Sequence, residues 1–292
     1  MGQLLDRHFK YVALLPALIV LIVLTFIPAV QLVRMAFSDI RLVAGGTEWS
    51  FVGLAHLQRL WNDPVAVIAV RNTALFTAIV VPAEAFLGLA LAYIVSQVRH
   101  ATAFYRTVII LPLLLPPIAI GALWRLMYDY NYGVINQLLG EVGIAGPLWL
   151  ANPDLALYSI MIVDVWHWTS FMFLIFLAGV QSIPGELIEA AEVDGGNPLQ
   201  VFVHVALPLL KSTIVVALML RTILAFKVFD VPYLLTGGGP GNATELINIY
   251  IEKVYFQQFR MGYGAMFALV AAVILSLFIV AYQRLTARQG DA

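Results

Sequence analysis

The chain has 292 residues, of which 62% are hydrophobic and 11% charged, and its formal net charge at pH 7 is -1. A chain this apolar, with a mean hydropathy of +0.91, would not remain soluble, so composition indicates an integral membrane protein. The charges are balanced and the sequence has no run of basic residues, so it lacks the basic patch that binding to a nucleic acid requires. The chain has no cysteine, so it has no disulfide and no thiolate metal site, and the redox compartment is left unassigned.

Six segments are apolar over about the 20 residues that cross a hydrocarbon core. In lipid the backbone must satisfy its own hydrogen bonds, so each segment is predicted to be a helix. The polar connections are too short for a soluble domain, which predicts an all-α membrane protein with one domain over residues 1–292 and a core of about 70–284. The predicted spans are Tyr11 to Val33, Thr73 to Val95, Thr107 to Met127, Leu155 to Val180, Thr213 to Leu235 and Ala265 to Tyr282.

The first span is expected to be retained, because the apolar run after Arg7 and Lys10 is too long for a signal peptide and no small-residue cleavage site follows. Six spans place both termini on one side of the membrane. The positive-inside rule favours the cytoplasm for that side, through Arg7, Lys10, Arg99, Arg106, Arg284 and Arg288. The opposite loop, Arg34 to Asn72, also contains four arginines, but it is long enough to hold an interfacial helix of its own. Its arginines therefore carry less weight in predicting which side of the membrane the termini face.

Prolines are expected to bend the third span. Pro112, Pro116 and Pro117 each remove a backbone donor, which kinks a helix. Such a bend suits a helix that curves around a cavity, and packing alone explains it equally well.

The polar loop 181–211, between the fourth and fifth spans, is predicted to be a bent helical hairpin. Pro184 suits a first helical position, carboxylates fill the first turn, and Gly195-Gly196 ends the helix. Asn197 then caps a second helix, with Gln200 completing a capping box. Pro208 is expected to interrupt that helix near the membrane. Read from its residues alone, this loop is either a solvated connection or a site that a partner approaches closely.

The segment from Glu189 to Pro208 closely resembles the Glu-Ala-Ala loop of bacterial ATP-binding-cassette importer permeases. In that family a short helix of the loop enters a groove of the ATPase subunit and transmits its closure. The resemblance implies a polar contact for Glu189, close packing for Ala190 and Ala191, and a turn at Gly195. The residues expected to couple to the ATPase are Glu186, Glu189, Ala190, Ala191, Asp194, Gly195, Phe202, Leu207 and Pro208.

Two further stretches resemble the outer loops of carbohydrate permeases. Residues 51–73 are similar to the first outer loop, and residues 235–245 to the loop after the fifth span in permeases for maltose-type sugars and glycerol phosphate. Leu14-Leu15-Pro16 with Ile27-Pro28 resembles the first of the two unlike permease subunits of that class. The resemblance thus covers Tyr11 to Arg284.

The glycine-rich stretch Gly237 to Gly241 is interpreted as a turn. No Gly-Lys-Ser/Thr follows it and no strand precedes it, so it is not a phosphate-binding loop. The chain contains no ATP-binding motif, so we expect no cofactor, no metal site and no covalent chemistry here. ATP and Mg²⁺ are expected on a partner ATPase.

Ionisable residues within the spans are costly and tend to face a cavity or a partner. Asp164, His167, Trp168 and Phe171 follow helical spacing, so one face combines polar groups with aromatic rings, as a sugar site requires. The alternative is that Asp164 and His167 pair locally for packing or cap a neighbouring helix.

The fifth span contains three more charges. Lys227 and Asp230 either line a cavity or neutralise one another, and Arg221 is expected to pair with Glu84 or with a partner subunit. The resemblance places the middles of the spans that flank the loop in the substrate cavity. This predicts a pathway formed by Asp164, His167, Trp168, Phe171, Leu224, Lys227, Val228 and Asp230.

Together these features predict the transmembrane subunit of an ATP-driven carbohydrate importer in the bacterial cytoplasmic (inner) membrane, working by alternating access. Its expected partners are a second, unlike permease, an ATPase dimer and a periplasmic or tethered solute-binding protein. One alternative is a secondary transporter that relays protons through Glu84, Asp164 and His167. Another is an intramembrane enzyme with Asp164 and His167 as an acid and base pair. The particular sugar is left open.

Overall fold

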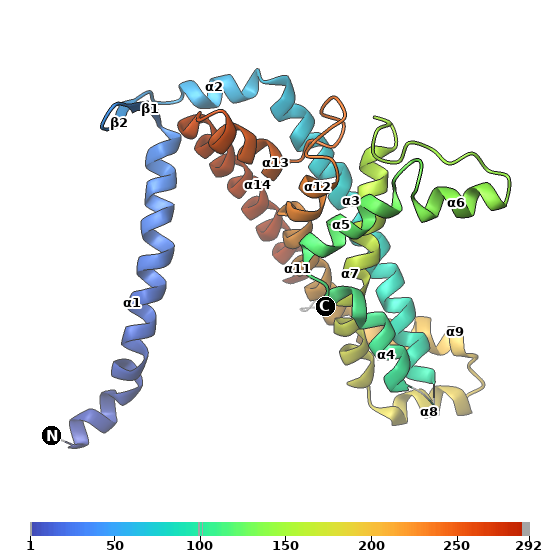
Figure 1. Ribbon diagram of the computed structural model, residues 1–292. Coiled ribbons are helices and arrows are strands. Elements are labelled where there is room, and N and C mark those ends of the chain that lie inside the picture. Colours follow the sequence, from blue (N-terminus) through green and yellow to red (C-terminus); the bar gives the residue numbers. More distant parts are fainter. Residues whose placement is uncertain (1, 99, 101, 288–292) are drawn as a thin grey trace. The chain divides into compact units, whose positions relative to one another are not determined.

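The computed structural model describes the backbone of residues 2–98, 100 and 102–287, and the side chains of residues 14–98, 100 and 102–284 (Figure 1). Four of the basic side chains used to predict the side of the termini, Arg7, Lys10, Arg99 and Arg288, lie outside this described set. The orientation of the termini therefore stays a prediction, as does the single-domain boundary.

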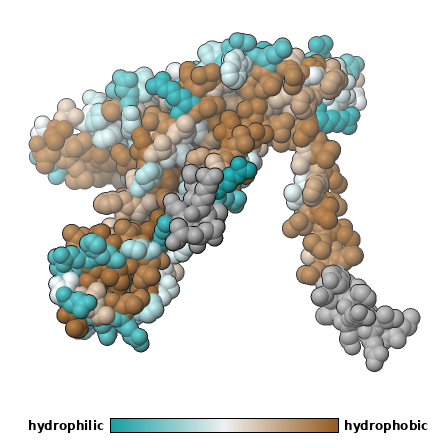
Figure 2. Space-filling view, turned by 180° about the vertical axis from the view of Figure 1, so that it is seen from behind, coloured by the Kyte–Doolittle hydropathy of each residue, from teal (hydrophilic) through white to brown (hydrophobic). Residues whose placement is uncertain are grey.

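The first of two compact units contains residues up to 63 together with 251–274. Helix α1 runs from Gly2 to Ala36 and is followed by an antiparallel hairpin and a short helix. The remaining elements of this part of the chain are β1 (Ser38–Val43), β2 (Gly46–Phe51), α2 (Ala55–Trp61), the π-helical segment η3 (Lys253–Gln257) and the first half of α14 (Met261–Ala287). Outside the grey residues, the column of α1 is hydrophobic along its length (Figure 2).

The hairpin was not predicted from the sequence. The expected interfacial helix is α2, but β1 and β2 precede it, so the loop between the first two spans is not wholly helical. The register pairs Ile40 with Trp49 and Val43 with Gly46 across a two-residue turn. Gly45 in that turn has φ of +100°, a conformation that glycine adopts at no steric cost.

The second unit contains residues 64–250 and the chain from 275 onwards. Its long helices are α3 (Pro64–Gln97), α7 (Ala156–Gln181) and α11 (Lys211–Phe226). Shorter elements connect them: α4 (Thr102–Ile110), η1 (Leu111–Leu114), α5 (Pro117–Met127), α6 (Val134–Glu141), α8 (Gly185–Val193), α9 (Pro198–Val201), η2 (Phe202–Ala206), α10 (Leu207–Leu209), α12 (Asp230–Leu235) and α13 (Ile247–Glu252).

Among the described residues, four helices are long and apolar enough to cross a membrane: Leu14–Ala36, Pro64–Gln97, Ala156–Gln181 and Met261–Arg284. Two bent helix pairs bring the number to six if each pair is one span: Thr102–Leu114 with Pro117–Met127, and Pro198–Leu209 with Lys211–Leu235. The six-span prediction agrees with this upper number. The helix of the second span is longer than its predicted segment, since α3 begins at Pro64 and not at Thr73.

The predicted proline kink is confirmed: the third span bends by 94° between Leu114 and Pro117. The prediction of a continuous fifth span is wrong. Its helix ends at Phe226, and a new helix begins at Asp230, after a short break.

Helices α3 and α7 form the most extensive contact in this unit. Gly88 makes their close approach possible, since a Cβ there would lie 2.6 Å from Cβ of Met172. Two apolar clusters lie along α3, α7 and α11. One includes Phe76, Ile160 and Ala225, and the other includes Ala92, Phe173 and Ala217. On each of the three helices, one buried charged residue lies in the sequence between the residues of the first cluster and those of the second. These three residues are called the charged layer.

Candidate functional site

The charged layer is a three-residue ion cluster of Arg221, Glu84 and Asp164, one residue from each of α11, α3 and α7. The guanidinium of Arg221 donates from Nε to Glu84 Oε2 at 2.5 Å and from Nη2 to Glu84 Oε1 at 2.9 Å. Nη2 also donates to Asp164 Oδ2. All three side chains are buried, and Glu84 and Arg221 have no exposed surface. The prediction that Arg221 pairs with Glu84 is confirmed.

This cluster fixes three membrane helices to one another. A guanidinium presents a planar fork of donors that matches carboxylates, so its geometry is much more restrictive than that of an apolar contact. Asp164 is therefore held in the protein interior, and it does not pair with His167 as the packing alternative proposed. Both carboxylates are engaged by Arg221, which gives the proton-relay and acid–base alternatives no free carboxylate here.

The aromatic face of α7 lies beside the cluster. Cζ of Arg221 is 4.7 Å from the centroid of the Trp168 ring, a cation–π contact. Trp168 in turn meets Phe171 edge-on at 5.7 Å and His167 at 5.1 Å. Three of the four α7 residues predicted to line a pathway, His167, Trp168 and Phe171, are thus in contact with one another through their rings. The fourth, Asp164, accepts a hydrogen bond from Arg221, which contacts the Trp168 ring.

The break in the fifth span is built around Lys227 to Phe229. Asn248 of α13 donates through its side-chain amide to the carbonyls of Phe226 and Val228, both at 3.3 Å, which satisfies groups that the break would leave unbonded. Asn248 was not a candidate in the sequence analysis, and no local pattern marks it.

The two charges at the break face different helix ends. Lys227 lies at the C-terminus of α11, and Asp230 is the first residue of α12, so each has the sign that its helix dipole favours. Among the residues that the structure describes, Lys227 and Asp230 form no ion pair, and the expectation that they neutralise one another is wrong. Leu224, Lys227 and Asp230 are exposed and Val228 is half-buried.

The hairpin 181–211 has the predicted helices. Asn197 Oδ1 accepts from the backbone N–H of Gln200, and the Gln200 side chain accepts from that of Asn197, so the capping box is confirmed. Gly195 ends α8 with φ of +87°. Two boundaries differ: Pro184 caps α8 instead of starting it, and Pro208 lies within a helix that continues to Leu209. The chain turns by 70° at Leu210, into α11.

A π-helical turn explains how Pro208 is tolerated. Over Phe202–Ala206 the hydrogen bonds lengthen by one residue, and the Leu207 N–H donates to the Phe202 carbonyl. A proline in a helix clashes with the preceding turn, and the wider π-turn directly before Pro208 relieves that clash.

Within the described chain, no residue of α8 is buried. Glu186, Glu189, Ala190 and Asp194 are all exposed, and Ala191 is half-buried. Phe202, in contrast, packs on Tyr93 of α3 with ring centroids 4.5 Å apart, and the Tyr93 hydroxyl donates to the Pro198 carbonyl at 2.9 Å. The predicted coupling residues thus divide into an exposed tip on α8 and a base at Phe202 that is attached to α3.

The two outer-loop motifs meet in space. The side-chain amide of Asn72 donates to the carbonyls of Ala243 and Glu245, both at 3.1 Å, and the Thr73 hydroxyl accepts from the Ile247 N–H. Thr244 donates to the Gly239 carbonyl at 2.6 Å within the glycine-rich turn. The turn is therefore held by the side chains of Asn72 and Thr73, in the N-terminal part of α3.

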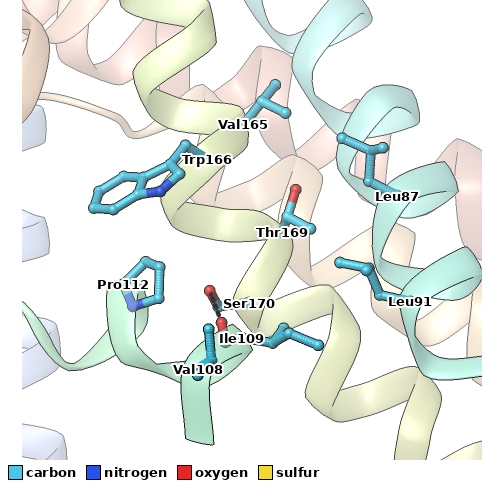
Figure 3. A pocket seen from close by; sticks show the side chains of 9 residues that line it. All are labelled: Leu87, Leu91, Val108, Ile109, Pro112, Val165, Trp166, Thr169 and Ser170. Carbon is cyan, nitrogen blue, oxygen red and sulfur yellow. Dashed lines mark hydrogen bonds between the residues drawn. The ribbon is translucent and has the colours of Figure 1, made fainter. Parts of the chain in front are cut away.

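A cavity of about 340 Å³ lies between α3, α4 and α7 (Figure 3). Its lining is apolar except for Thr169 and Ser170, and Ser170 donates to the Ile109 carbonyl at 2.6 Å. With 3.6 residues per turn, Val165 and Thr169 face nearly opposite to His167 and Phe171 on α7. This cavity is therefore separate from the predicted pathway face.

Residues 84–290 match the family described as the binding-protein-dependent transport system inner membrane component. This chain belongs to that family. The match covers more than half of the chain and includes the ion cluster, the hairpin 181–211 and the broken fifth span. A member of this family is a membrane subunit of a transport system and not an enzyme.

Relatives with similar sequences include two sugar-transport permeases. The sulfoquinovosyl glycerol transport system permease protein of Agrobacterium fabrum is 35% identical over 96% of this chain and 91% of its own length. The trehalose/maltose transport system permease protein of Thermococcus litoralis is 35% identical over 95% of this chain and 93% of its own length.

Among solved structures, a bacterial ABC transporter involved in the import of the acidic polysaccharide alginate contains a chain with the same fold. The TM-score is 0.87 at 22% identity, over 98% of both chains. The helical permease fold predicted from the sequence is therefore confirmed, with the hairpin β1–β2 as an addition to it.

Proposed function

We propose that this chain forms half of the translocation pathway of an ATP-driven carbohydrate importer. The observation that carries the proposal is the hairpin 181–211: its tip helix α8 has no buried residue among those described, while its base is joined to two membrane helices. An isolated nine-residue helix is marginal in water, so a partner surface that accepts it explains why it is kept. The partner with this role in the resembling permeases is the ATPase subunit.

The coupling route follows from the contacts. Movement of α8 passes through the Tyr93–Phe202 contact to α3 and through the turn at Leu210 to α11. Arg221 ties both of these helices to α7. The three helices therefore move as one body, which is what alternating access by rocking requires.

The substrate pathway is proposed to run along the face of α7 that carries His167, Trp168 and Phe171, and past the break at Lys227–Asp230. His167 on this face is buried, and the rings of Trp168 and Phe171 are half-buried. Rings with adjacent hydrogen-bonding groups suit the apolar faces and hydroxyls of a sugar. The named substrates of the two relatives are also carbohydrates or carbohydrate derivatives. ATP and Mg²⁺ bind the ATPase subunits in this proposal, and this chain holds neither.

The proposed assembly contains a second, unlike permease, an ATPase dimer and a periplasmic or tethered solute-binding protein. In this proposal the hairpin 181–211 and both termini lie on the cytoplasmic side of the membrane. A tagged chain extracted gently from its native membrane is expected to co-purify with a permease and an ATPase. Recovery of the chain alone, under conditions that preserve other complexes, would contradict this composition.

Glu189→Lys tests the coupling role. Reversing the charge at the exposed tip removes a contact with the ATPase, so we expect the assembly to remain in the membrane while uptake of the sugar is lost. Glu141→Lys makes the same charge change on α6, at an exposed position in another loop, and is expected to transport normally. Normal uptake by the Glu189→Lys variant would refute the proposal.

A further inference from the structure

The hairpin β1–β2 has one apolar and one polar face. Strand residues alternate between faces, and directly paired residues share one. The register therefore places Ile40, Leu42, Trp49 and Phe51 together on one face. The opposite face holds Val43 together with the polar residues Asp39, Arg41, Glu48 and Ser50, and Arg41 pairs with Asp39 at 3.1 Å.

Most of the apolar face is left uncovered by the residues that the structure describes. Ile40 is buried, but Leu42, Trp49 and Phe51 are exposed, and Phe51 shows 82% of its surface. Helix α2 continues this pattern. Leu54, Leu57 and Trp61 follow helical spacing and are exposed, Trp61 by 84%. The other side of α2 is anchored by His56, whose Nε2 lies 3.1 Å from the Ser38 carbonyl.

The hairpin is attached to the end of a membrane helix. The Ser38 hydroxyl donates to the Arg34 carbonyl in the last turn of α1, and Cζ of Arg34 lies 4.6 Å from the Trp49 ring centroid. Figure 1 shows α1 ending at the hairpin, with the hairpin and α2 running across the direction of α1. Elements that lie across the end of a span lie along the membrane surface.

We propose that the apolar face of the hairpin and the exposed stripe of α2 rest on the lipid bilayer as an in-plane anchor. The anchor consists of Leu42, Trp49, Phe51, Leu54, Leu57 and Trp61. Trp side chains concentrate at the headgroup level, because the ring is apolar and its N–H needs a polar partner. Arg34 at the same level places a cation beside lipid phosphates, and the opposite face of the hairpin presents its charges to water. The lipid contact is continuous with that of α1.

The absence of cysteine from the chain allows a direct test. A single cysteine replaces Phe51 on the apolar face or the neighbouring Ser50 on the polar face, in the full complex reconstituted into lipid nanodiscs. A nitroxide label is attached, and its collision rates with oxygen, which concentrates in lipid, and with a water-soluble nickel chelate are compared. The complex without an introduced cysteine supplies the background. Because both side chains are exposed, neither substitution is expected to disturb folding, which size-exclusion chromatography verifies.

We expect oxygen collisions to dominate at Phe51→Cys and nickel collisions to dominate at Ser50→Cys. Trp61→Cys and Arg59→Cys should show the same contrast on α2, because Arg59 is exposed and helical spacing places it nearly opposite to Leu57 and Trp61. Dominant nickel collisions at Phe51→Cys would overturn the proposal. Shielding from both reagents would also overturn it, by showing a protein contact, and shielding that appears only when the solute-binding protein is added would identify that protein as the occupant. The readout needs no transport, so it remains decisive if the proposed substrate or coupling role is wrong.

Discussion

Arg221→Met is the most informative single change to the membrane core. Methionine has a similar length and is apolar, so it fills much of the space that the guanidinium leaves. The change deletes all three hydrogen bonds to Glu84 and Asp164 and leaves two buried carboxylates without their cation. Stability should therefore fall because of lost charge pairing and not because of a cavity.

The expected loss follows from the burial of the cluster. Removing one partner of a fully buried ion pair typically costs about 3–5 kcal/mol, because the remaining charge is uncompensated. In a large domain each kcal/mol lowers the melting temperature by about 2–4 °C, so we expect a decrease on the order of 10 °C.

The assay is the melting temperature of the purified complex, read as the loss of its size-exclusion peak after heating. Arg41→Met is the matched control, since Arg41 pairs with Asp39 at 3.1 Å while the two side chains are 74% and 37% exposed. An exposed pair of this kind contributes about 0–1 kcal/mol. Equal melting temperatures for Arg221→Met and Arg41→Met would refute the reasoning.

A rescue variant separates charge from shape. Combining Arg221→Met with Glu84→Gln and Asp164→Asn removes all three charges while keeping similar volumes, and we expect most of the lost melting temperature to return. If the triple variant is less stable than Arg221→Met alone, the uncompensated carboxylates are not the cause.

Two further changes test the packing of α3. Gly88→Val adds a side chain at a position where even a Cβ atom would lie 2.6 Å from Cβ of Met172. We therefore expect the complex to lose about 1–3 kcal/mol of stability and to melt at a lower temperature. Gly140→Val on α6 is its control, because nothing lies within 4 Å of a Cβ there, and equal melting temperatures for the two variants would contradict the close α3–α7 contact. Asn72→Ala removes the amide that donates to the carbonyls of Ala243 and Glu245, at an expected cost of about 1–3 kcal/mol. Amide hydrogen exchange across residues 236–247 should accelerate, and unchanged exchange would show that Asn72 does not hold the turn.

Local features were predictable from the sequence because their causes lie within a few residues. The capping box at Asn197 and Gln200 and the glycine end of α8 depend only on immediate neighbours, and both are present. The proline bend of the third span belongs to the same class. The hairpin was also local, since Ile40 and Leu42 alternate with polar residues on one side of Gly45-Gly46, and Trp49 and Phe51 do so on the other. This alternation is the available signal, and the six-helix interpretation left no place for it.

Long-range pairs were less accessible. Hydropathy shows that Glu84, Asp164 and Arg221 are costly in a membrane, but Arg221 is 137 residues from Glu84 and 57 from Asp164. From the sequence, Glu84 or a partner subunit was expected as the ion-pair partner of Arg221. The pairing of Asp164 with Arg221 was not predicted. Which carboxylates meet the guanidinium depends on the contact of α3 with α7, and that contact depends on Gly88 and its opposing Met172.

The broken fifth span shows why mean hydropathy is insufficient for locating a pathway. Residues 213–235 are apolar enough for one helix, yet the helix stops at Phe226 because the Asn248 amide, from a helix 20 residues further on, bonds the carbonyls of Phe226 and Val228. Non-helical backbone at membrane depth is tolerated where it is bonded within the protein or lines an aqueous cavity. Asn248 supplies the bonds on one side of the break, while Lys227 and Asp230 are exposed. Two charges that neither pair with each other nor lie buried need water or a partner subunit beside them, and the proposed pathway is one way to supply that water.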